Sequence, residues 1–166
     1  MDIGIFDEIQ RRYELTEKLF KLLRKNAGIQ EKILWEPERL SDTDEALDFI
    51  RDLFIIDFFA AFERLLRDRL SASIVSQGDA LSENLVEVVR KESEYIKIEY
   101  LLDILKNIAD PQQVGLIKQI KKYRDWVAHG RKPLSISPAK PVDIYIVFEA
   151  IRLVSVVVDT GGLLHK

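Results

Sequence analysis

Arg124 and His129 are the residues of this chain best suited to chemistry on a phosphate. They are separated by four residues near the end of a basic segment, and the chain has only one other histidine, His165. Cleavage of RNA without a metal ion needs a base for the 2′-hydroxyl, an acid for the leaving oxygen and a cation for the charge that grows on phosphorus. Histidine exchanges a proton near neutral pH and arginine stays charged, so the pair matches these roles.

The spacing within the segment sets limits on which side chains can act together. Asp125 and His129 are four residues apart and lie about 40° apart around a helix, so we expect the carboxylate to orient the imidazole. Arg124 and His129 lie about 140° apart, so they can address one phosphate only if the helix loosens near Gly130 or a second chain contributes. This geometry predicts either a loosened helix end or a homodimer with two copies of the motif lining one cleft.

Basic charge is concentrated around the motif although the whole chain has a net charge of −3. Between residues 117 and 132 there are six basic residues and one acidic residue. The acidic total argues against indiscriminate nucleic-acid binding, whereas a local basic segment can hold an RNA backbone. The alternative is a solvated lysine face on a surface helix. The residues predicted to bind RNA are Lys121, Lys122, Arg131 and Lys132.

The motif resembles the ribonuclease motif of the HEPN (higher eukaryotes and prokaryotes nucleotide-binding) domains, in which an arginine precedes a histidine by a similar spacing. A polar residue after the arginine (Asp125), a small residue before the histidine (Ala128), a long helix upstream and a break downstream add to the likeness. The sequence detail of the resemblance covers only residues 121–132. It implies an all-α HEPN-like domain and proton transfer by His129, with Arg124 on the phosphate.

The resemblance also implies a metal-independent endoribonuclease with no cofactor, whose cleft forms between paired domains. Such a protein would be the toxin of a toxin–antitoxin or phage-defence system, with an antitoxin protein as a further partner. Glu63 corresponds to an acid near the cleft, although pairing with Arg67 at i+4 is the structural alternative. Some HEPN toxins have a tyrosine two residues after the histidine, where this chain has Arg131, which argues against control by tyrosine modification.

Two other functions fit the same residues. The first is a noncatalytic HEPN-like module that binds a nucleotide or a protein partner, with Arg124 as a phosphate clamp and His129 capping its helix. The second is a purely structural helical interaction protein. The chain has no glycine-rich phosphate loop, no histidine pair for zinc and no serine elbow, so neither a metal nor a cofactor site is expected.

Composition predicts an ordinary globular domain over residues 1–166. Of the 166 residues, 47% are hydrophobic and 32% are charged, as in ordinary globular proteins. The chain is long enough for one hydrophobic core and too short for two full domains. There is no cysteine, which excludes disulfides and thiolate metal sites and agrees with a reducing compartment. The acidic start predicts no export signal, and no apolar run reaches membrane-spanning length, so a cytoplasmic protein without a membrane segment is expected.

Hydrophobic periodicity predicts a bundle of about five helices in a single domain. The 41–75 helix is apolar almost all round at residues 54–59, so other helices or another subunit must cover it. The last segment is rich in β-branched residues, but its three- and four-residue steps favour a helix. The predicted helices are 5–25 (stopped by residues 26–28), 41–75, the segments 81–92 and 95–108 as one bent helix or two consecutive ones, a motif helix from Pro111 to Gly130, and 142–158.

Overall fold

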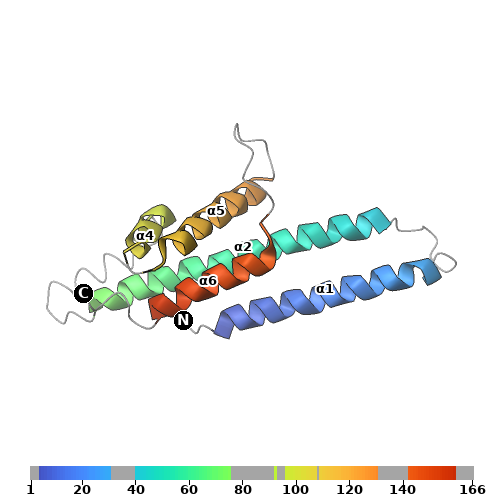
Figure 1. Ribbon diagram of the computed structural model, residues 1–166, viewed down its shortest axis with the longest axis horizontal. Coiled ribbons are helices and arrows are strands. Elements are labelled where there is room, and N and C mark those ends of the chain that lie inside the picture. The colour runs from blue at the N-terminus through green and yellow to red at the C-terminus, as the bar shows by residue number, and fades with distance from the viewer. Residues whose placement is uncertain are drawn as a thin grey trace.

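Helices α1 (Gly4–Gln30), α2 (Leu40–Val75), α4 (Ile98–Leu105), α5 (Pro111–Ala128) and α6 (Ile144–Asp159) make up the computed structural model (Figure 1). The structure describes residues 4–30, 40–75, 92, 96–107, 109–130 and 142–159, and no strand occurs among them. The prediction of an all-α bundle of about five helices is confirmed.

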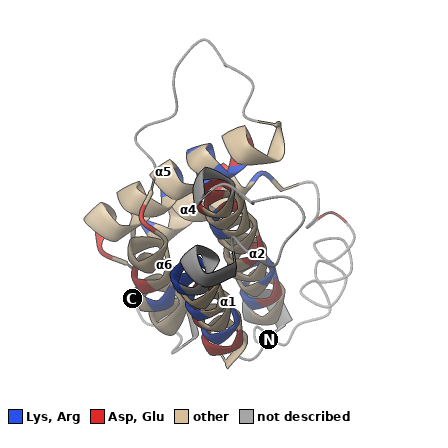
Figure 2. Cartoon of the chain, turned by 90° about the vertical axis from the view of Figure 1, so that its right-hand side faces the viewer, with Lys and Arg blue, Asp and Glu red and all other residues tan. Residues whose placement is uncertain are grey.

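Helix α2 is the centre of the bundle and contacts α1, α5 and α6. α1 and α2 run antiparallel, and α6 lies beside both (Figure 1). α4 packs on α5, and these two helices lie above the other three when the molecule is viewed along its length (Figure 2). The motif helix α5 is therefore held from below by α2 and α6 and from the side by α4.

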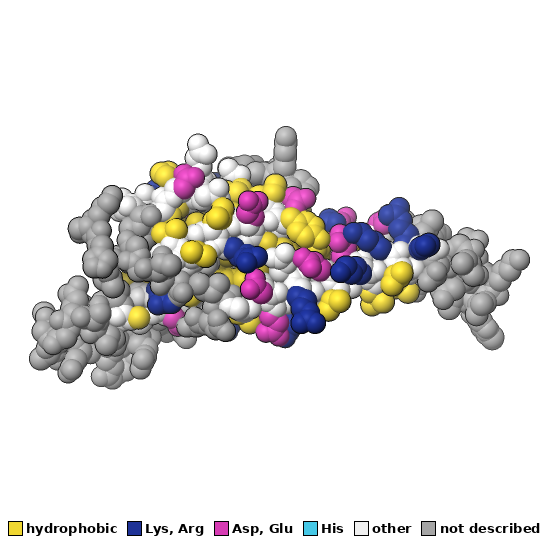
Figure 3. Space-filling view, turned by 60° about the horizontal axis from the view of Figure 1, so that its bottom comes forward, with side chains coloured by type: hydrophobic (Ala, Val, Ile, Leu, Met, Phe, Trp, Pro, Cys, Tyr) yellow, Lys and Arg dark blue, Asp and Glu magenta, His cyan; other side chains and the backbone are white. Residues whose placement is uncertain are grey.

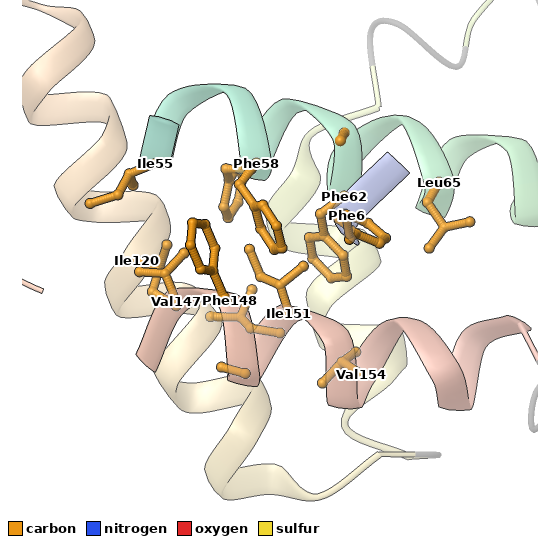
Figure 4. Packing of buried hydrophobic residues seen from close by; sticks show 14 of the residues in the cluster. Phe6, Ile55, Phe58, Phe62, Leu65, Ile120, Val147, Phe148, Ile151 and Val154 are labelled. Carbon is orange, nitrogen blue, oxygen red and sulfur yellow. The ribbon is translucent and has the colours of Figure 1, made fainter. Parts of the chain in front are cut away.

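The core lies where α1, α2, α5 and α6 meet (Figure 4). Phe58 of α2 packs against Phe148 of α6, with ring centroids 4.5 Å apart, and against Phe6 of α1, with centroids 5.0 Å apart. Ile55 and Phe62 on the same helix are also fully buried. Helices of the same chain therefore cover the apolar middle of α2, and this feature no longer requires a second subunit.

The C-terminal half of α1 and the N-terminal half of α2 extend past α5 and α6 as a two-helix arm (Figure 1). Four leucines of α1 are about half exposed. Three of them, Leu15, Leu19 and Leu22, lie about 110° or more around the helix from the middle of the buried face formed by Phe6, Ile9 and Tyr13. The four leucines are Leu15, Leu19, Leu22 and Leu23.

Local cap chemistry explains where α5 and α6 begin. The Asp110 carboxylate accepts a hydrogen bond from the backbone N–H of Gln112 at 2.9 Å, and Pro111 occupies the first helical turn. Asp143 accepts one from the N–H of Tyr145 at 2.8 Å. The helical prediction for the last segment is confirmed.

Two predicted boundaries differ from the structure. α1 continues through residues 26–28 to Gln30, so the predicted stop was wrong; one glycine costs a helix only about 1 kcal/mol, which the rest of the helix can absorb. The helix expected at 95–108 is shorter and is observed as α4. The segment 81–91 and the proline-rich stretch 131–141 lie outside the described residues.

Candidate functional site

Helix α5 ends at the motif, and the end is well defined. His129 is its C-cap residue, with its N–H donating to the carbonyl of Asp125 at 3.0 Å, and Gly130 follows with φ of 74°. A positive φ favours glycine, so α5 terminates in the left-handed conformation at Gly130. His129 is exposed and lies at the negative end of the helix dipole.

The guanidinium of Arg124 is packed against α2. Its Nη2 donates to Glu63 Oε2 at 3.0 Å, and its Nη1 lies 3.1 Å from Asp125 Oδ1. The centre of the guanidinium also lies 4.8 Å from the ring centroid of Phe59, close enough for a cation–π contact. With its side chain 23% exposed, Arg124 is held in place from three sides but still reaches the surface.

Asp125 contacts both residues of the predicted pair, but through different atoms. Its carboxylate binds Arg124 and Lys121, while its backbone carbonyl lies 2.6 Å from Nδ1 of His129. The expectation that the carboxylate orients the imidazole was therefore wrong. The cations at 121 and 124 attract the carboxylate, and the imidazole contacts the Asp125 carbonyl instead, which also accepts the backbone N–H of His129 and has a second lone pair for the ring.

The carbonyl contact assigns the tautomer of a neutral His129. A carbonyl only accepts, so Nδ1 must carry the proton and Nε2 is left with a lone pair. Nε2 lies on the opposite side of the ring from Nδ1 and the side chain is exposed. The ring is thus presented with its basic nitrogen directed away from the helix end.

Glu63 lies between two arginines on the face of α2 that receives α5. It accepts from Arg67 Nη2 at 2.8 Å and from Arg124 at 3.0 Å. Arg67 also donates to the carbonyl of Ile96, just before α4. The predicted Glu63–Arg67 pair is present, and the same carboxylate lies beside Arg124, so the two interpretations of Glu63 are compatible.

Among the basic residues predicted to bind RNA, Lys121 is already neutralised. Its Nζ lies 2.6 Å from both Glu99 of α4 and Asp125. Burial opposes its charge, but the hydrogen bonds to Asp125 and Glu99 outweigh burial and raise the pKa of its ammonium group. Lys122, in contrast, is exposed and has no ion pair with a described residue. Arg131 and Lys132 lie outside the described residues.

Three residues near the motif were not anticipated from the sequence, namely Asp52, Phe59 and Glu99. Tyr123, adjacent to Arg124, donates a 2.7 Å hydrogen bond to the buried carboxylate of Asp52. Phe59 and Glu63 are four residues apart on α2, so their shared face was a usable signal. No comparable signal existed for Glu99 or Asp52, because neither is near the motif in the sequence.

No group of three or more histidine, aspartate or glutamate side chains that could hold a metal ion occurs within the described ranges. None of the described helices is both long and apolar enough to cross a membrane. No family model, no curated protein and no solved structure matches this chain. Function therefore has to be inferred from the residues around Arg124 and His129.

Proposed function

We propose that this protein is a HEPN-like, metal-independent endoribonuclease that cleaves RNA with His129 and Arg124. The observation that carries the proposal is that Asp125 holds both side chains, Arg124 through its carboxylate and His129 through its carbonyl. Two groups suited to proton transfer and to phosphate binding are thereby oriented by one residue. Precise orientation of such groups is what lowers the barrier of a reaction of this type.

The proposed reaction begins at Nε2 of His129, which takes the proton of the RNA 2′-hydroxyl. The 2′-oxygen then attacks phosphorus, the bond from phosphorus to the 5′-oxygen breaks, and the leaving oxygen takes a proton from a second, protonated imidazole. The products are a 2′,3′-cyclic phosphate and a 5′-hydroxyl. Arg124 binds the phosphate oxygens as their charge grows, and because a guanidinium has five N–H donors, its two carboxylate partners do not exhaust it.

The two residues point to a composite site in a homodimer. Arg124 is held against Glu63 and Phe59 of α2, whereas His129 stands at the exposed end of α5. Arg124 of one chain can serve the phosphate that is attacked beside His129 of the other, and the second imidazole supplies the acid. The proposed biological setting is a toxin–antitoxin or phage-defence system, with an antitoxin protein as the further partner.

The test is RNA cleavage by purified protein in excess chelator. We expect His129→Ala and Arg124→Ala each to lower the rate by about 100-fold or more, because each removes a group that acts on the reacting atoms. The matched controls are His165→Ala, which changes the other histidine, and Arg11→Ala, which changes an exposed arginine on α1. If the motif variants cleave RNA as fast as the controls, this assignment is wrong.

A noncatalytic module that binds a nucleotide or a protein is the second candidate, and one observation favours it. Arg124 has two carboxylates within 3.1 Å, which fits a residue that holds α5 to α2 and binds a phosphate with its remaining N–H groups, without chemistry. In this case no preparation cleaves RNA at any pH, and Arg124→Ala weakens nucleotide binding while His129→Ala does not. Calorimetric titration with a nucleoside triphosphate separates the two candidates.

A further inference from the structure

The outer face of α6 has an unusual order of side chains. Tyr145, Glu149, Arg152 and Val156 are all exposed and follow one another at intervals of four, three and four residues. This is the spacing of the seam along which two helices pack in a coiled coil. The order along the seam is apolar, acidic, basic, apolar, so reversing its direction exchanges the acid with the base and the two apolar ends with each other.

Such a seam is complementary to itself in one orientation only. If two copies of α6 pack antiparallel about a two-fold axis between residues 150 and 151, Glu149 of each chain faces Arg152 of the other. Tyr145 then faces Val156 at both ends, as core positions do in antiparallel helix pairs. A parallel pair would place Glu149 against Glu149 and Arg152 against Arg152. A different partner with charges of only one sign would repel either Glu149 or Arg152.

Further apolar residues flank the seam on one side. Ile146 is 46% exposed and Leu153 is 49% exposed, seven residues apart on α6. Figure 3 shows hydrophobic side chains between charged ones over the face of the bundle that is turned forward in that view. Burying these residues against a partner helix would remove apolar surface from water, which favours association.

A groove beside the seam provides room for a second helix. It has a volume of about 370 Å³ and lies between α6 and α1, with Gln10 of α1 on one side and Leu153 of α6 on the other. Tyr145 is fixed at the groove because its hydroxyl donates to Glu17 of α1 at 3.1 Å. Side chains that project from a helix packed on α6 can enter this groove.

The charged pair in the middle of the seam is available for a partner. Glu149 makes no ion pair within the described part of the chain. Arg152 lies 3.2 Å from Asp7, but both side chains are about half exposed or more, and exposed pairs of this kind contribute little to stability. Arg152 can therefore contact the partner's carboxylate without losing a strong interaction.

We propose that the outer face of α6 is the surface through which two copies of this chain associate, antiparallel and with reciprocal Glu149–Arg152 pairs. This proposal goes beyond the proposed function. Helix α5 ends near the start of α6 (Figure 1), and in an antiparallel α6 pair the two helix starts lie about 20 Å apart, so this surface is separate from the one at which two motifs would share a phosphate. It does not depend on RNA cleavage, because the seam, the groove and the charge order are independent of the motif.

Charge reversal tests the pairing directly. In Glu149→Arg every charge at the centre of the interface is positive, and in Arg152→Glu every charge is negative, so we expect each variant to dissociate about 100-fold more readily than the parent. Mixing the two variants should restore a dimer, now a heterodimer, because the positive centre of one chain then faces the negative centre of the other. The double variant should dimerise alone, because it exchanges the two charges and every facing pair is again opposite in sign.

Sedimentation velocity over a range of concentrations measures these equilibria, and circular dichroism verifies that each variant is folded. Glu45→Arg, which makes the same charge change at an exposed position of α2, is the matched control and should leave the dimer intact. A parent that is monomeric throughout, or variants that fail to recover on mixing, would overturn the proposal. A parent that dimerises but does not cleave RNA removes the proposed function and leaves the α6 surface standing.

Discussion

The hydrogen bond from Tyr123 to Asp52 should contribute measurably to the stability of the fold. It joins the motif helix α5 to α2 over 2.7 Å, between a tyrosine that is 8% exposed and an aspartate that is 2% exposed. Tyr123→Phe removes the hydroxyl and keeps the ring, including its contact with Trp126 at a centroid distance of 5.7 Å. The substitution therefore isolates the hydrogen bond from the packing.

The expected loss of unfolding free energy is about 2 kcal/mol. Hydrogen bonds to charged groups contribute roughly 1.5–3 kcal/mol, and removing one partner leaves a buried acceptor that must be satisfied elsewhere. Asp52 has at least one other interaction, so its carboxylate is not abandoned and the loss should not exceed this range. With a urea dependence of about 2 kcal/mol/M, the midpoint of unfolding should fall by about 1 M.

Urea unfolding followed by circular dichroism is the assay, and Tyr100→Phe is the control. Tyr100 is 63% exposed on α4, so the same chemical change should alter stability by less than about 0.5 kcal/mol. In an Asp52→Ala background, Tyr123→Phe should lose most of its effect, because its hydrogen-bond partner is gone. If Tyr123→Phe behaves like the control, the bond does not hold α5 onto α2 as argued above.

Two further predictions concern charged residues near the motif. Lys122→Ala should weaken RNA binding, and the slope of log affinity against log salt concentration should become shallower by about 0.7 for each phosphate that is no longer neutralised. Lys121→Ala should mainly reduce thermal stability, because its ammonium group neutralises two carboxylates. Equal effects of both variants on the slope would contradict this. Hydrogen bonds from Lys106 and Lys118 hold the pKa of Asp103 at about 2, so its contribution to folded stability is full above pH about 4 and is lost as the pH falls towards 2. A carboxyl NMR titration should show this pKa, and Lys118→Ala should move it towards 3.8, the ordinary value, whereas a pKa of 3.8 in the parent would refute the assignment.

Local sequence was sufficient to predict the helical class and several helix ends. The Asp110 cap and Gly130 act through groups within a few residues, so their effect can be read without the fold. The three- and four-residue periodicity of α6 likewise outweighed the strand preference of its β-branched residues. The buried residues of α5 also follow one another in steps of three, because one side of this helix rests on α2 and α6.

Periodicity was less informative for α1, because its apolar residues occupy more than one side of the helix. Ile9 is buried on the side that faces the bundle, whereas Leu19 lies on another side and is 55% exposed. Which of these sides is buried depends on how the neighbouring helices pack. The exposed leucines of α1 therefore could not be identified from the sequence pattern alone.

At the motif, too, some contacts can be predicted from the sequence and others depend on the packing of the helices. Residue types and spacing identified Arg124 and His129 and placed Asp125 within reach of both. The partners that determine their chemistry come from far along the chain: Glu63 is 61 residues from Arg124, and Asp52 is 71 residues from Tyr123. Contacts over such separations form only when α2 and α5 pack together. The tertiary structure therefore decided that Glu63 pairs with the arginine, whereas the contacts of Asp125 with Lys121 and His129 are local to α5.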